Sequence, residues 1–79
     1  MIKDVTVQDC VNLQKSFIKH CNRAEQHEFV TLAMIHVKLD KSVKKIQEEG
    51  KVSNQKEARA MFRVVLRAMG KDCSEYEEN

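Results

Sequence analysis

Cysteine and histidine side chains are the residues of this sequence that could hold a metal ion. His20, Cys21 and His27 lie close together in the chain, and Cys10 lies eleven residues before Cys21. Zinc sites usually contain ligand pairs spaced as Cys-x2-Cys, His-x3-His or His-Glu-x-x-His, and the sequence contains none of these spacings. Cysteines on an apolar helical stripe are usually small hydrophobic core residues. We therefore expect no metal ion and no other cofactor.

The cysteines also indicate the redox compartment. Cys10 and Cys21 are expected in one helix, where a rise of ~1.5 Å per residue separates them by ~16 Å. A disulfide tolerates at most ~7 Å between Cα atoms. Cys73 lies far along the chain, in an acidic segment. Three reduced thiols, no signal-peptide pattern and no apolar run long enough to span a membrane predict a cytoplasmic protein without membrane contact.

The sequence also lacks the pattern of a nucleophilic or phosphate-binding enzyme. Nucleophilic catalysis needs a thiol or hydroxyl, a base and an orienting group fixed beside a pocket. A chain of 79 residues has little room for a cleft. Its glycines, Gly50 and Gly70, are placed as helix ends and not in a phosphate-binding loop. We expect a protein that is not an enzyme.

Four basic residues share one face of the last expected helix. They follow i, i+3, i+7, i+11 spacing and are Lys56, Arg59, Arg63 and Arg67, called here the basic stripe. Guanidinium groups suit carboxylates and phosphates, so the stripe predicts an anionic partner. An acidic protein ranks above nucleic acid because the acidic C-terminus could fold back onto the stripe and compete with a polyanion, whereas a protein can add apolar contacts. In addition, no aromatic residues interleave with the stripe to stack on bases. The alternative is a solvated face whose arginines pair with Glu57, with the second helix or with the acidic C-terminus.

A second candidate surface is apolar. The stretch Phe29–Val37 is apolar around nearly its whole circumference, although each helix of a three-helix bundle has only two neighbours. One side should therefore stay open. We predict that Val30, Met34 and Val37 form an interface with another protein or with a second copy of the chain. Helix tilt or an ordered C-terminal tail could cover these residues instead.

Apolar periodicity and capping residues predict the elements that position these surfaces. Thr6 and Asn54 are the expected N-caps of helices over about 7–21 and 55–69, and Gly50 ends a helix over about 24–49. A break is expected in residues 22–28, where only Ala24 is apolar. The apolar stripes on its two sides stay nearly in phase, so a continuous helix through this region remains the alternative.

The amino-acid composition also predicts a helical protein. The chain has no proline, no tryptophan, two glycines and many Lys, Glu, Gln, Ala, Leu and Met residues, which favours an all-α protein. Its 33% of charged residues exceeds the usual ~25%. We predict a small three-helix bundle over residues 1–71, followed by a flexible acidic tail over 72–79. The predicted function is a non-enzymatic protein–protein interaction module: a small helical adaptor, regulator or inhibitor, homodimeric or bound to a different protein. A small nucleic-acid-binding protein that uses the basic stripe is the alternative.

Overall fold

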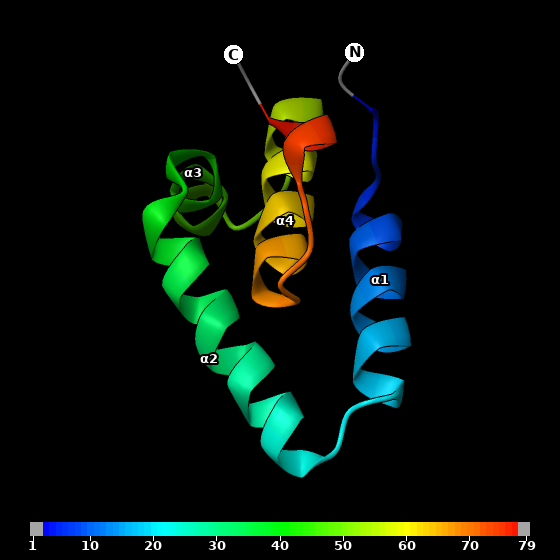
Figure 1. Cartoon of the computed structure of the whole chain (residues 1–79). Coiled ribbons are helices and arrows are strands. Elements are labelled where there is room, and N and C mark those ends of the chain that lie inside the picture. Colours follow the sequence, from blue (N-terminus) through cyan, green and yellow to red (C-terminus); the bar gives the residue numbers. More distant parts are fainter. Residues whose placement is uncertain (1–2, 78–79) are drawn as a thin grey trace.

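The computed structural model describes residues 3–77, which form four α-helices and one short 3-10 helix and contain no strand (Figure 1). The helices are α1 (Val7–Lys19), α2 (Arg23–Leu39), α3 (Lys41–Glu49), α4 (Gln55–Ala68) and the 3-10 helix η1 (Ser74–Tyr76). The predicted all-α class is confirmed, and the predicted number of helices is wrong by one. Within residues 3–77, no helix is both long and apolar enough to cross a membrane.

Side-chain caps determine where α1 and α2 begin. The Thr6 hydroxyl accepts a hydrogen bond from the Asp9 N–H at 3.0 Å, and the Asp9 carboxylate accepts one from the Thr6 N–H at 2.8 Å. Asn22 and Glu25 form the same reciprocal pair, with both bonds at 2.9 Å. Each pair satisfies two backbone donors that a helix start leaves unbonded. The break predicted between the first two helices is therefore confirmed.

The helix predicted over residues 24–49 is wrong, because the chain bends at Asp40. This residue has φ −95° and ψ 114°, and it ends α2 and begins α3. Its carboxylate accepts a hydrogen bond from the Ser42 N–H at 3.0 Å, as an N-cap does. Asp is a poor residue inside a helix because its side chain competes for nearby backbone groups. Gly50 ends α3 with φ 74°, as predicted.

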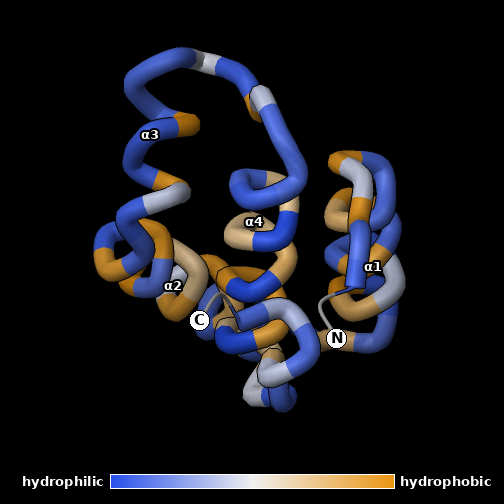
Figure 2. Tube along the Cα trace, turned by 90° about the horizontal axis from the view of Figure 1, so that it is seen from above, coloured by the Kyte–Doolittle hydropathy of each residue, from blue (hydrophilic) through white to orange (hydrophobic). Residues whose placement is uncertain are grey.

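The central helix of the bundle is α4. It contacts α1, α2, α3 and η1, and it runs between α1 on one side and α2 and α3 on the other (Figures 1 and 2). Its buried apolar residues are Ala58, Ala60, Val64, Val65, Leu66 and Ala68. The alanines leave room for neighbouring helices to approach closely. In contrast, α2 keeps one apolar side open, with Val30 and Met34 exposed.

Both ends of the described chain are held against α4. The Gln55 side chain donates to the Val5 carbonyl at 2.6 Å and accepts from the Val5 N–H at 2.9 Å. The segment predicted as a flexible acidic tail is described as far as Glu77, and it folds back along α4. There the Tyr76 ring packs on Phe62 with ring centroids 4.6 Å apart. Glu78 of the predicted tail lies outside the described residues.

Candidate functional site

The residues of the predicted apolar interface lie along one side of α2. The exposed fractions of Val30 and Met34 are 51% and 59%, and Val37 is half-buried. Their i, i+4, i+7 spacing covers about 10 Å of helix. Neither helix tilt nor the folded-back segment covers Val30 and Met34. The open apolar side is therefore a feature of the folded chain.

These side chains form one wall of a groove of about 430 Å³. The groove is lined by Gln14 of α1, by Phe29, Val30, Ala33, Met34, Val37 and Lys38 of α2, and by Gln47 of α3. A deeper hollow of about 280 Å³ shares five of these lining residues and reaches Met61, Val64 and Val65 of α4. The two hollows thus lie between α1 and the α2–α3 pair, and α4 forms the floor of the second. It offers apolar surface with an amide side chain on each wall.

The residues of the basic stripe do not share one exposed face. Arg63 is only 5% exposed. It donates to the Asp40 carboxylate at 3.0 Å and to the Tyr76 carbonyl at 2.7 Å. This guanidinium therefore joins the α2–α3 bend, the middle of α4 and the C-terminal segment. For Arg63, the expectation of an exposed cation is wrong, because a buried carboxylate lies opposite it.

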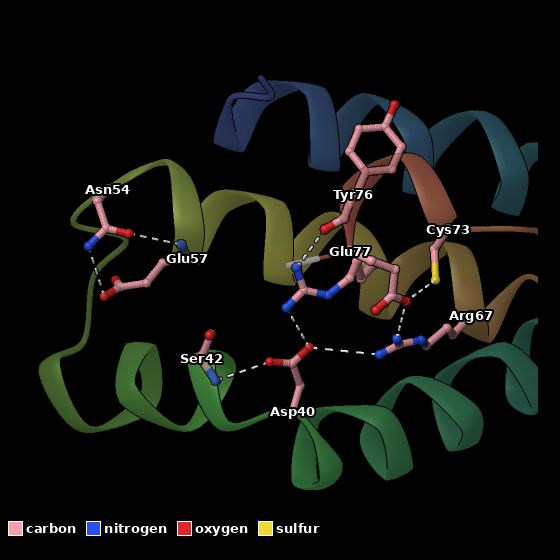
Figure 3. Close-up of polar contacts among 9 residues, drawn as sticks. Asp40, Ser42, Asn54, Glu57, Arg67, Cys73, Tyr76 and Glu77 are labelled. Atoms are coloured by element: carbon pink, nitrogen blue, oxygen red, sulfur yellow. Dashed lines mark hydrogen bonds and ion pairs between the residues drawn. The ribbon is translucent and has the colours of Figure 1, made fainter. Parts of the chain in front are cut away.

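Arg67 lies beside the same ion pair (Figure 3). It donates to the Glu77 carboxylate at 2.6 Å and approaches Asp40 at 3.8 Å. The Cys73 thiol also donates to Glu77, at 3.2 Å. This thiol contact, together with the Arg67 guanidinium, holds the pKa of Glu77 below its ordinary value. The acidic C-terminal segment thus contacts the stripe within the molecule.

The other two stripe residues lie nearer the surface. Lys56 is exposed, and Arg59 is half-buried and pairs with Asp4 at 3.3 Å. Binding of an anionic partner by these four residues stays a prediction. However, at least three of the four cations already have acidic partners within the chain. This favours the paired-face alternative over a free cationic face.

The sequence reading missed the structural role of Asp40. A signal for it was present, because Asp is among the best N-cap residues and Lys41-Ser42 follows it. The apolar residues Leu39, Val43 and Ile46 continue a helical spacing across Asp40, and this spacing masked the signal. In the structure Leu39 is 72% exposed whereas Val43 is buried, so these residues do not form one continuous apolar face.

The residues considered as metal ligands are dispersed in the structure. Cys10 is buried and its thiol faces the Ala58 carbonyl at 3.8 Å, whereas His20 and His27 are exposed. In the part of the chain that is described, no three His, Cys, Asp or Glu residues are grouped closely enough to hold a metal ion. The described cysteines are all free thiols.

We expect the three thiols to differ in reactivity. Burial raises the pKa of Cys10 from 9.0 to about 11, which leaves about a hundredth of the thiolate of an ordinary cysteine. Burial also raises the pKa of Cys73 and of Cys21, but Cys73 is buried whereas Cys21 is only half-buried and so more accessible to a reagent. In the native protein at pH 8, a disulfide reagent should modify Cys21 at least about tenfold faster than Cys10, and also faster than Cys73. Mass spectrometry of quenched samples measures the three rates. Equal rates in native and denatured protein would contradict this burial.

No protein family matches this chain, and no curated protein or solved structure is significantly similar to it.

Proposed function

We propose that this protein is a non-enzymatic protein–protein interaction module that binds its partner in the groove beside α2. The observation that carries the proposal is the exposed apolar wall of Val30 and Met34 above an apolar floor. Complete burial of an exposed Val or Met side chain is worth about 1.5–3 kcal/mol, and covering the exposed half of each of these two residues gains part of that, which favours association. Exposed apolar surface rimmed by polar groups is typical of interaction sites. Three free thiols fit a cytoplasmic location.

Nucleic-acid binding has less support. A phosphate-binding face needs accessible cations, and Arg63 is buried against Asp40 while Arg67 contacts Glu77. Releasing these arginines would leave buried or half-buried acids without their partners. A helical adaptor, regulator or inhibitor that acts through the groove requires no such rearrangement.

We expect Met34→Glu to weaken partner binding at least about tenfold, because it places a charge in the apolar wall. The matched control is Ile35→Glu. Ile35 is the next residue and is also exposed, at 47%, but it does not line the groove. Affinity capture from cells that produce the protein, with nuclease treatment and quantitative mass spectrometry, compares both variants with the wild type.

Binding in the groove is supported by proteins that the wild type and Ile35→Glu capture but Met34→Glu does not. Sedimentation equilibrium of the same three proteins tests self-association through the groove. Chemical denaturation should show that both variants remain folded. If Met34→Glu is folded, captures the same proteins and has the same oligomeric state as the wild type, the groove is not the interaction site.

A further inference from the structure

The charged side chain among the described residues that line the groove is a lysine. Lys38 lines the groove beside Met34 and Val37. On the α3 wall, Lys44 lies one turn before Gln47, and residues three apart are neighbours on a helix surface. Within residues 3–77, the ion pairs involve Lys3 and the arginines of α4, and none involves a lysine of α2 or α3. Lys38 among the lining residues, and Lys44 next to Gln47 by helix spacing, therefore form no ion pair with any other residue of the described range.

Acidic side chains near α2 lie away from this rim. Glu25 and Glu28 line a different hollow, together with Leu32, Met69 and Gly70. Asp40 is buried against Arg63 at the bend. Consequently, a ligand in the groove meets Lys38, with Lys44 one turn before Gln47, and no carboxylate among the lining residues.

We propose that the groove binds an amphipathic helix of another protein that carries Asp or Glu residues beside its apolar stripe. This proposal rests on the proposed function and names the chemistry of the partner. The apolar wall repeats at i, i+4 and i+7 along α2, a ridge that matches the groove between side chains of a second helix. The described chain has no strand to which an extended peptide could add. The acidic residues of the partner helix pair with Lys38 and Lys44.

A second copy of this chain fits the groove less well. In a two-fold symmetric dimer, the same patch meets itself. Each copy would then bring its own Lys38 into a contact whose lining residues include no carboxylate, so neither lysine would gain an acidic partner from the lining of the other groove. A protein with the opposite charge supplies that partner and approaches faster at low ionic strength.

The test uses the full chain and a displayed library of twenty-residue helical peptides. Each peptide has the same leucine stripe at i, i+3/i+4 and i+7 spacing, and its flanking positions are varied among Glu, Gln and Lys. We expect selection to enrich Glu at the flanks. Methyl NMR of a selected peptide bound to the protein should show shifts at Val30, Met34 and Val37. Its affinity should fall as salt increases.

Charge reversal at adjacent residues supplies the matched control. Lys44→Glu should weaken the selected acidic peptide about tenfold, and the Lys38→Glu/Lys44→Glu double variant should weaken it further. Lys45→Glu should leave the affinity unchanged. Lys45 lies on the other side of α3, beside Asn54 and Glu57. Each of the two lysines has a glutamate four residues later, Glu48 or Glu49, so local effects on the helix are matched.

The possible outcomes separate this proposal from the proposed function. If the peptides selected at the groove prefer Lys or Gln at their flanks, the proposal of an acidic partner is overturned, but the groove remains the interaction site. Equal loss of affinity for Lys44→Glu and Lys45→Glu overturns it as well. A wild-type dimer that Met34→Glu separates shows that the occupant is a second copy. If no peptide of any charge binds at the groove, both the acidic partner and the interaction site are overturned.

Discussion

Replacing Arg63 with methionine is expected to lower the free energy of unfolding by about 3–5 kcal/mol, because it leaves the Asp40 carboxylate buried without its main partner. The variant also removes the hydrogen bond to the Tyr76 carbonyl. Arg67, at 3.8 Å from Asp40, compensates only in part. A chain of 79 residues has a total stability of about 4–12 kcal/mol, so the loss is a large share of it. Urea denaturation followed by circular dichroism measures the change.

Two further variants separate the ion pair from other effects. Lys56→Met removes an exposed cation of the same stripe and should change stability by less than about 0.5 kcal/mol. Asp40→Asn keeps an efficient N-cap for α3 but removes the negative charge. The double variant Asp40→Asn/Arg63→Met should lose at least about 1 kcal/mol less free energy of unfolding than the sum of the losses in the two single variants. A loss at Arg63 no greater than the loss at Lys56 would contradict the structural role of this residue.

Local signals in the sequence were sufficient for most helix boundaries. Thr6, Asn22 and Asn54 each accept a backbone hydrogen bond from the residue three positions later, and these bonds involve only neighbours in the chain. Gly50 ends α3 in the left-handed conformation that glycine adopts without strain. Such features depend on residue type and spacing, so they are visible before any tertiary contact is known.

The two features that were not predicted depend on tertiary contacts as well as on local signals. The bend at Asp40 follows from a carboxylate that caps α3 and also pairs with Arg63, 23 residues later in the chain. The same contact explains why Arg63, which helical spacing places on the same face as the exposed Lys56, is buried. Helical spacing places side chains on one face, but it does not say which neighbouring element covers that face. The α2 wall was predictable because its apolar residues exceed what a small bundle buries.

Phe29→Ala is expected to lower the free energy of unfolding by about 3–5 kcal/mol, the usual cost of removing a buried phenylalanine ring. Phe29 is buried and forms a core cluster with Val65 and Ala68 of α4. Its ring also lies 5.1 Å from that of Phe17, measured between centroids, and so links α2 to α1. Because α1 and α2 meet mainly through α4, the remaining side chains are poorly placed to fill the space. Thermal and urea denaturation provide the measurement.

The adjacent residue supplies the control for this prediction. Val30→Ala shortens a side chain that is half exposed, so its effect on stability should stay within about 0.5 kcal/mol. The two substitutions should therefore change different quantities. Phe29→Ala lowers the free energy of unfolding, whereas Val30→Ala weakens partner binding and leaves the stability nearly unchanged. Similar stability losses for both would mean that Val30 is covered in the free protein. The wall beside α2 would then be part of the core and not an open interaction surface.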